Sequence, residues 1–428
     1  MKKTLITLAA AAAMATPAMA VEFQPTEDVK LNLYGQVYMD FFYNYSESHN
    51  GGSVSTAGNG FTIAQGTTGN SEGIHSFGSE GFFSSRLGLD VNYKNIIGGT
   101  IEFGAKPSEI VRRAFMQVYF GGETDHSLLI GKDTSIAAYS FGQVSRDGGA
   151  LNNYGTLADN RRLQLRYDYK GFQLAVILPV DLGKVDGNVA DTGSTIKKIT
   201  KDNYEVKNFD TIPRLELAYT LGMENGSEFK AFAGYAAYVY QLQSGLNEDN
   251  TAKEGYSATP AGLLGKRTAQ HAFNIGIGGT QNFGNSFLNY TAWFGQNLHL
   301  TDSHSPTSDP RFFLGSKFHD INTNEYDINE ARYEVYSAGG AIGFGHTFAE
   351  KYTLQAGVGY SASFGPGYKT QDDRLGAYLN TVIKVNDWYS IIPEIAYLDE
   401  LIGSQISGKG NQKQGYTFIA GVMNVFEF

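Results

Sequence analysis

The 428-residue sequence contains no cysteine, two tryptophans and ten prolines. Without cysteine, neither a disulfide framework nor a thiolate metal site can hold the chain together. Beyond residue 20 no apolar run approaches the ~20 residues that a membrane-spanning helix requires. These absences exclude two frequent classes, the disulfide-stapled secreted domain and the helical membrane protein.

Signals for enzymatic chemistry are also missing. The eight histidines show no metal-binding spacing such as H-E-x-x-H, and no G-x-S-x-G motif occurs. The stretch GGAIGFGHTF at 339–348 has strand-like sequence with no helix after it, so we interpret its glycines as space for bulky neighbours rather than as a phosphate-binding loop. Acidic residues outnumber basic ones, 43 to 33, which argues against nucleic acid as a partner. We expect no enzyme, no metal and no cofactor.

What the sequence does contain is glycine and aromatic residues: 52 Gly, 27 Tyr and 28 Phe, with a mean hydropathy of −0.26. Glycine and aromatics at this level disfavour helices and favour strands. An averaged polar composition is compatible with a membrane barrel, because its strands alternate lipid-facing and lumen-facing residues. The composition therefore predicts an all-β protein.

The N-terminus has the layout of a secretory signal. Lys2 and Lys3 precede an apolar run from Leu5 to Ala15, and the small-residue site Ala18-Met19-Ala20 follows. The run is too short to serve as a transmembrane anchor. We predict that residues 1–20 are a signal peptide and that residues 21–428 form the mature protein.

The C-terminal stretch 416–428 alternates with a period of two. Its apolar and aromatic positions are Tyr416, Phe418, Ala420, Val422, Phe426 and Phe428. This period indicates a strand with one apolar face. A barrel uses such a last strand to pair with the first and remove the open edge. The ending resembles that of bacterial outer-membrane barrels, in which the terminal aromatic is part of the signal read by the barrel-assembly machinery. That resemblance gives Phe428 this role.

The same alternation recurs along the chain and predicts about sixteen strands. They lie near 31–45, 82–93, 100–106, 112–121, 127–133, 162–170, 171–180, 213–222, 228–241, 270–281, 286–299, 331–348, 352–364, 373–385, 389–398 and 416–428. Connections after even-numbered strands are short, and most of those after odd-numbered strands are long. This asymmetry is typical of an antiparallel up-and-down transmembrane barrel with tight periplasmic turns and long outer loops.

Strand parity assigns several charged residues to the lumen. Leu87, Leu89 and Val91 must face lipid, which turns Arg86 and Asp90 inward. By the same reasoning Leu163 and Leu165 face out, so Arg162 and Arg166 face in. A charge on the lipid face costs ~2–4 kcal/mol at mid-bilayer. In Arg112-Arg113, parity leaves open which arginine points inward. These arginines either tune a pore or merely solvate a wet wall.

Five segments, in this order, resemble the Gram-negative general-diffusion porins: LYGQVYMDFFY, SRLGLDVNY, RRAFMQVYF, LLIGKD and RLQLRYDYKGF. The resemblance implies a sixteen-stranded, usually trimeric barrel whose third outer loop folds into the lumen. It implies that Arg86, Arg112 and Arg162 match wall arginines of the family, and that the constriction loop lies near 134–161. Within that loop it suggests a helical turn at 136–139 and an acid at Asp147.

The resemblance implies a porin of the Gram-negative outer membrane, in contact with outer-membrane lipid and lipopolysaccharide. Such a porin passes small hydrophilic solutes and ions by passive diffusion, with Arg86, Arg112, Arg162, Arg166 and Asp147 at its narrowing. Two other interpretations stay open: a channel specific for a sugar, phosphate or carboxylate, and a structural or adhesive barrel.

Overall fold

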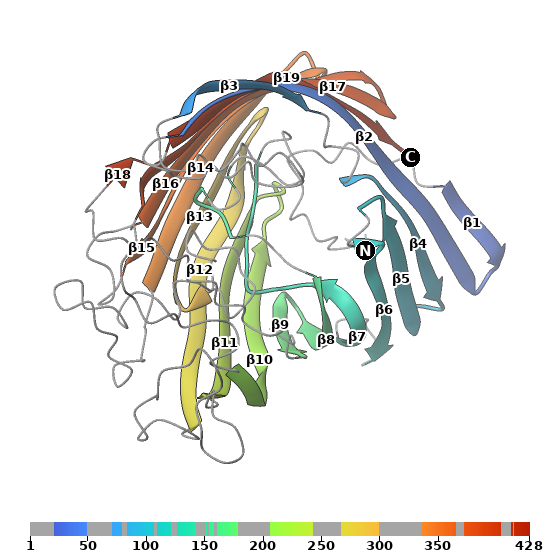
Figure 1. Cartoon of the computed structure of the whole chain (residues 1–428). Helices are drawn as coiled ribbons and strands as arrows, with labels where there is room; N and C mark the ends of the chain where they lie inside the picture. The colour runs from blue at the N-terminus through green and yellow to red at the C-terminus, as the bar shows by residue number, and fades with distance from the viewer. Residues whose placement is uncertain are drawn as a thin grey trace.

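The computed structural model describes residues 21–48, 71–78, 84–106, 109–120, 126–142, 151, 154–157, 161–178, 206–242, 267–298, 336–364, 372–403, 412–413 and 415–428. Nearly all of these residues form one antiparallel sheet that closes into a barrel (Figure 1). Within the described part of the chain, no helix is long and apolar enough to cross a membrane. The predicted all-β antiparallel barrel is confirmed.

Sixteen strands of the described part of the chain form the ring. In order around the barrel they are β2 (Val29–Ser48), β4 (Arg86–Tyr93), β5 (Ile97–Gly104), β6 (Val111–Phe120), β7 (His126–Thr134), β8 (Arg161–Tyr169), β9 (Phe172–Ile177), β10 (Val206–Gly222), β11 (Glu228–Leu242), β12 (Arg267–Phe283), β13 (Ser286–Gln296), β14 (Tyr336–Phe348), β15 (Tyr352–Phe364), β16 (Asp372–Asn386), β17 (Tyr389–Gly403) and β19 (Gly415–Glu427). Each corresponds to one of the strands predicted from alternation.

The ring closes where β19 pairs with β2, from Glu427 opposite Gln36 to Gly415 opposite Ser48. At the end of β19, Phe428 exchanges two backbone hydrogen bonds with Gly35, of 2.8 and 3.0 Å. The edge of β19 that faces β2 is therefore paired along its length, as a lipid environment demands.

Three short strands were not predicted from the sequence. β1 (Val21–Thr26) pairs with the start of β2, and β3 (Ser71–Gly78) pairs with its end. β18 (Gln412–Lys413) pairs with the end of β17. β1 continues the line of β19 along β2, because Val21 lies opposite Leu33 just beyond the Phe428–Gly35 contact. The long β2 thus has two successive partners on each edge.

Alternation along the strands separates an apolar outer face from a polar inner face. In β8, Leu163 and Leu165 are 55% and 43% exposed, whereas Gln164 and Arg166 are 4% and 6% exposed. The other strands continue the outward apolar rows, for example with Leu87, Met116, Ile130, Ile275 and Phe344. The outer surface is therefore a hydrocarbon-compatible belt, which is the signature of a membrane-spanning barrel.

Most of the described connections after even-numbered ring strands are tight turns. Lys94 and Asn95 have φ of 51° and 56°, and Ala349 and Glu350 have φ of 48° and 60°. Two successive residues with positive φ form the turn whose twist matches that of antiparallel strands. Aromatic side chains gather at this end of the barrel, where Trp388, Tyr389 and Phe426 are in ring contact, with centroids 4.6–6.1 Å apart. Such a cluster of aromatic residues is typical of the girdle at a membrane interface.

Candidate functional site

Charged side chains gather on the inner face of β4, β6 and β8. We call this surface the arginine wall, defined by Arg86, Arg112, Arg113, Arg162 and Arg166. Arg86 follows the parity assigned from the sequence, because its neighbour Leu87 is exposed on the outer face. Arg162 lies in the same inward row as Gln164 and Arg166. The arginine wall thus brings four arginines selected from the sequence, and one that was not selected, to one side of the lumen.

A β-bulge explains how two consecutive arginines both point inward. Glu102 of β5 pairs with Arg113, whereas the next residue, Phe103, pairs with Val111. Arg112 is therefore an extra residue in β6, and the alternation shifts by one position at this point. Arg112 reaches Glu102 and Arg113 reaches Asp133, both on the inner face. Strand parity alone did not decide which of Arg112 and Arg113 points inward. In the structure both face the lumen.

Glu102 binds the upstream arginines of the wall. Its Oε1 accepts a 2.8 Å hydrogen bond from Arg112 Nε, and its Oε2 lies 4.0 Å from Arg86 Nε. The Tyr34 hydroxyl donates a further bond of 3.0 Å to Oε2. The Glu102 side chain is 6% exposed, so its charge is compensated by these neighbours rather than by bulk water.

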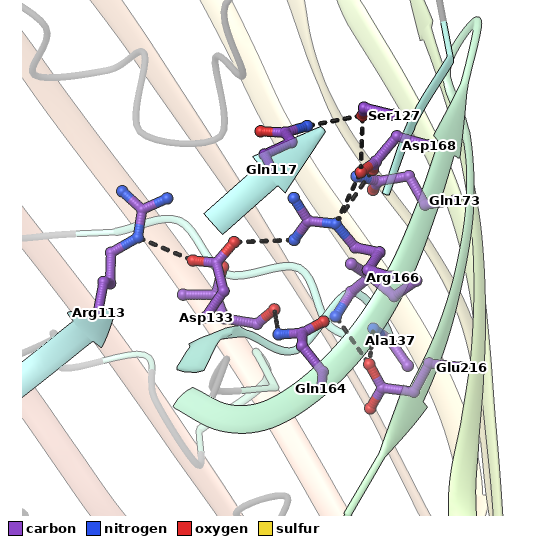
Figure 2. Close-up of polar contacts among 12 residues, drawn as sticks. Arg113, Gln117, Ser127, Asp133, Ala137, Gln164, Arg166, Asp168, Gln173 and Glu216 are labelled. Atoms are coloured by element: carbon purple, nitrogen blue, oxygen red, sulfur yellow. Dashed lines mark hydrogen bonds and ion pairs between the residues drawn. The ribbon is translucent and has the colours of Figure 1, made fainter. Parts of the chain in front are cut away.

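Asp133 binds the downstream arginines in the same way (Figure 2). Its Oδ1 accepts from Arg113 Nε at 2.8 Å, and its Oδ2 accepts from Arg166 Nη1 at 2.9 Å. Arg166 also donates through Nε to Asp168 at 3.1 Å, and Gln173 bonds the same carboxylate at 2.6 Å. Because each carboxylate bridges two donors, the guanidinium groups are held in fixed positions. Arg86 and Arg113 keep about a third of their side chains exposed.

Directly after β7 the chain turns to the inside of the barrel (Figure 1). We call residues 135–142 together with 151 and 154–157 the in-folded segment. The predicted helical turn at 136–139 is wrong, because residues 136 and 137 form a bend and residues 138 and 139 have no regular secondary structure. The N–H groups of Ile136 and Ala137 do not bond within the segment but donate to the Glu216 carboxylate, at 2.8 and 3.2 Å. A charged acceptor on the wall replaces the intrahelical carbonyls.

The inner face of β10–β15 receives the in-folded segment, and we call it the latch wall. Asn274 Nδ2 donates to Ala137 O at 2.6 Å, and Lys230 Nζ donates to Ala138 O at 3.0 Å. Farther along, Trp293 Nε1 donates to Gly155 O at 2.8 Å. Apolar contacts accompany these bonds in a buried cluster that includes Ile136, Tyr139, Leu157, Phe232 and Trp293.

Glycines on the latch wall make room for the in-folded segment. A Cβ at Gly278 would lie 2.4 Å from the Tyr139 ring, and one at Gly359 would lie 2.1 Å from Tyr154 O. Within the stretch 339–348, Gly339 sits against Trp293 and Gly345 against Phe287. The interpretation of these glycines as space for bulky neighbours is confirmed.

The structure does not test the roles assigned from the sequence to Asp147 and Phe428. Asp147 lies outside the described residues. Phe428 is on the outer face, 39% exposed, with its ring over Gly35. In the described part of the chain, no group of three or more His, Cys, Asp or Glu side chains could hold a metal ion.

Sequence reasoning missed Asp133, Arg214 and Glu216, and it left the direction of Arg113 open. The motif Arg214-Leu215-Glu216-Leu217 carried a usable signal, because its leucines face out and its charges face in, as in the arginine motif of β8. The bulge at Arg112 left no such signal. Glu216 binds backbone groups, which no residue pattern reveals.

Comparison with solved structures places this geometry in a known fold. OmpT of Vibrio cholerae is 14% identical and matches with a TM-score of 0.51, covering 95% of this chain and 100% of its own. The outer-membrane channel DcaP of Acinetobacter baumannii is 16% identical, with a TM-score of 0.53 over 95% and 99%. The chain has the fold of Gram-negative outer-membrane porins.

At this identity the porin fold is shared, while no family model and no curated protein matches the sequence. The porin fold and the apolar outer belt together make this chain a transmembrane barrel of the outer-membrane type. The comparisons show the fold alone, so the arginine wall and the in-folded segment are described from the residues of this chain.

Proposed function

We propose that this protein is a porin of the Gram-negative outer membrane, forming a water-filled channel for passive diffusion of small hydrophilic solutes and ions. The observation that carries the proposal is the arginine wall on the inner face of a closed barrel. Barrels of sixteen to eighteen strands leave an aqueous channel, whereas eight-stranded barrels are filled by side chains.

Electrostatics support a wet interior. Clusters of arginine and carboxylate are expensive in a dry core, where desolvation can exceed the Coulombic gain. The side chains of Arg86 and Arg113 on the inner face are 30% and 33% exposed. A lumen that contains water explains both the clustering of charges and the partial exposure of the arginines. The exposed parts of the arginines stay solvated, while their carboxylate partners fix their positions.

We assign the narrowing of this channel to Arg86, Arg112, Arg162 and Arg166 on one side and to the loop at 134–161 on the other. Asp147 is retained as the acid contributed by that loop. Arg113, Glu102 and Asp133 join this set, because their ion pairs connect its arginines. Fixed charges in a confined passage tune ion preference without any covalent step.

Outer-membrane lipid and lipopolysaccharide are the partners proposed for the apolar belt. We also propose residues 1–20 as a cleaved export signal and a homotrimer as the assembled form. One of the solved OmpT structures, 15% identical with a TM-score of 0.50, is described as a trimer. Native mass spectrometry in mild detergent tests this assembly, and a monomer mass would overturn it.

The decisive experiment for the channel is single-channel recording in planar bilayers with a salt gradient. We expect stable ohmic conductance, a reversal potential that follows the gradient, and no saturation with solute. Heat-unfolded protein is the control. Saturable block by one sugar, phosphate or carboxylate would favour the solute-specific channel. A folded protein without conductance would favour the structural or adhesive barrel.

Recognition by the barrel-assembly machinery is proposed for Phe428. Deleting Phe428 should sharply lower the yield of protein in the outer membrane. Gly35→Leu should mimic the deletion in part, because a Cβ there would lie 2.2 Å from the Phe428 ring. Phe426→Ala, which removes an aromatic from the same strand, is the matched control. Equal yields for the Phe428 deletion and the natural chain would exclude this role.

A further inference from the structure

The carboxylate of Glu216 is the point at which the in-folded segment first meets the wall. It accepts the Ser135 hydroxyl at 2.7 Å and the Ile136 and Ala137 N–H groups at 2.8 and 3.2 Å. Figure 2 shows Glu216 reaching from the wall to Ala137. Three consecutive residues thus bond one carboxylate whose side chain is 0% exposed. Such charge-assisted bonds are stronger than neutral ones.

Arg214 and Asn274 lie next to Glu216, and we call these three residues the latch. Arg214 Nε lies 2.7 Å from Glu216 Oε1, and Arg214 Nη2 donates to Asn274 Oδ1 at 3.2 Å. Asn274 in turn bonds the carbonyl of Ala137. The wall therefore supplies an acceptor for the segment's donors and donors for its acceptors. Backbone groups of Ile136 and Ala137, which lie outside the strands, thus find hydrogen-bond partners on the wall.

The latch binds the chain at the point where it leaves β7. Ser135 is two residues after Asp133, which holds Arg113 and Arg166. The residues bound by Glu216 are thus the first that leave β7, and they set the direction in which the chain departs. Gly234 leaves space for Arg214 and Ala137, because a Cβ at this position would lie 2.8 Å from Arg214 Nη2 and 3.2 Å from the Ala137 Cβ.

We propose that Glu216 is the positioning residue of the channel: it fixes the path of the in-folded segment and thereby determines the open-channel current. The proposal rests on the proposed porin function. Glu216 acts through the segment rather than on the solute, because its carboxylate is covered by residues 135–137. A packed side chain without this role would affect the stability of the barrel but not the placement of the segment.

The experiment exploits the absence of cysteine. Ala138→Cys introduces one thiol in the buried part of the segment, 3% exposed. Its labelling by a small charged thiol reagent reports release of the segment without requiring conductance. In this background we compare Glu216→Ala, Glu216→Gln and the double variant Arg214→Leu/Glu216→Leu. The double variant removes both charges, so it remains informative if an unpaired Arg214 prevents folding.

Glu394→Ala is the matched control. Glu394 is also a buried inward carboxylate, 3% exposed, and it accepts a hydrogen bond from Asn380 of the neighbouring strand. Heat-modifiable migration on gels establishes folding for every variant. Single-channel traces are recorded from each variant that folds.

We expect Glu216→Ala and the double variant to label about tenfold faster or more. Their open-channel current should step between several levels, while Glu394→Ala behaves as the parent. Glu216→Gln should fall between, because the amide keeps one acceptor but turns a donor toward the backbone N–H groups. Unchanged labelling in folded Glu216 variants would overturn the latch. Faster labelling with an unaltered current would overturn its control of the channel. A parent without conductance whose Glu216 variants still label faster would refute the porin function and support the latch.

Discussion

The arginine wall and the latch wall are built by the same strand alternation, yet they treat the lumen differently. On the arginine wall, long charged side chains pair with carboxylates of neighbouring strands and remain partly open to the interior. On the latch wall, polar groups pair with a backbone that crosses the interior, and apolar side chains are buried beneath it. Alternation decides which residues face inward, and side-chain size decides whether backbone can cover them.

Glycine marks the difference between the two walls. Gly278 and Gly359 lie where Tyr139 and Tyr154 approach, at distances that no Cβ tolerates. The arginine wall presents guanidinium groups at comparable inward positions. The gaps at Gly278 and Gly359 admit the Tyr139 ring and the Tyr154 backbone of the in-folded segment.

Breaking the latch wall by filling a gap should have the largest effect. In Gly359→Leu the new side chain meets a backbone oxygen at Tyr154, which cannot rotate away. We expect the in-folded segment to move and the barrel to lose about 1–3 kcal/mol of stability. The temperature of the heat-modifiable transition and the conductance measure both effects.

Gly222→Ala is the control for this substitution, because no atom lies within 4 Å of the added Cβ. It should leave both the transition and the conductance unchanged. If Gly359→Leu behaves like this control, the described contact between Gly359 and Tyr154 does not hold the segment in place.

Charge removal on the arginine wall should come next in size. Arg113→Ala and Arg166→Ala each leave Asp133 with one partner, and the double variant leaves it with neither. Each lost charge changes the barrier for a passing ion by about 1 kcal/mol or more, so cation preference should rise several-fold in the double variant. Reversal potentials in dilute salt measure this shift.

Measurements of barrel stability distinguish the loss of the Asp133 ion pairs from the loss of positive charge in the lumen. Leaving the buried Asp133 carboxylate without a partner is destabilising, so the double variant should lose more stability than the two single variants together. Arg166→Lys keeps the charge but cannot bridge Asp133 and Asp168 with one planar fork. It should lower the transition temperature while preserving the reversal potential. A cation shift in Arg166→Lys would show that geometry rather than charge controls selectivity.

The sequence predicted the strands of both walls because lipid enforces the alternation. Leu163 and Leu165 must face hydrocarbon, so Arg162 and Arg166 follow without any knowledge of their partners. The same reasoning applied to Arg214 and Glu216 would have placed them inward. It could not have shown that Glu216 binds Ile136 and Ala137, since any sequence provides backbone N–H groups.

The failures of prediction share a physical origin. The bulge at Arg112 adds one residue to β6, and a period of two cannot register an insertion. The stretch 136–139 has helix-compatible residues, Ile-Ala-Ala-Tyr, but bonds to the latch wall outweigh local propensity. β1 and β3 escaped notice because each is short and pairs with an end of β2.

The bulge itself allows a smaller and sharper change to the arginine wall. Deleting Arg112 leaves Val111 next to Arg113 and restores regular pairing with Phe103 and Glu102. Arg112→Ala removes the same charge but keeps the extra residue. We expect both variants to fold and to shift the reversal potential equally toward cations. An unequal shift would mean that the bulge also sets the position of Arg113, and failure of the deletion to form a barrel would mean that the bulge is needed for closure.

Salt concentration should give the smallest effect and the clearest distinction between the walls. The screening length falls from ~10 Å at 0.1 M to ~3 Å at 1 M salt. The altered ion preference of Arg113→Ala and Arg166→Ala arises from unscreened charge, so it should shrink toward the parent value in molar salt. The altered current of Gly359→Leu arises from a displaced backbone, so its ratio to the parent current should stay constant. Recording each variant at both concentrations gives this comparison directly. If the arginine variants keep their full shift in molar salt, their effect is one of pore shape, and the two walls would then act on passing ions in the same way.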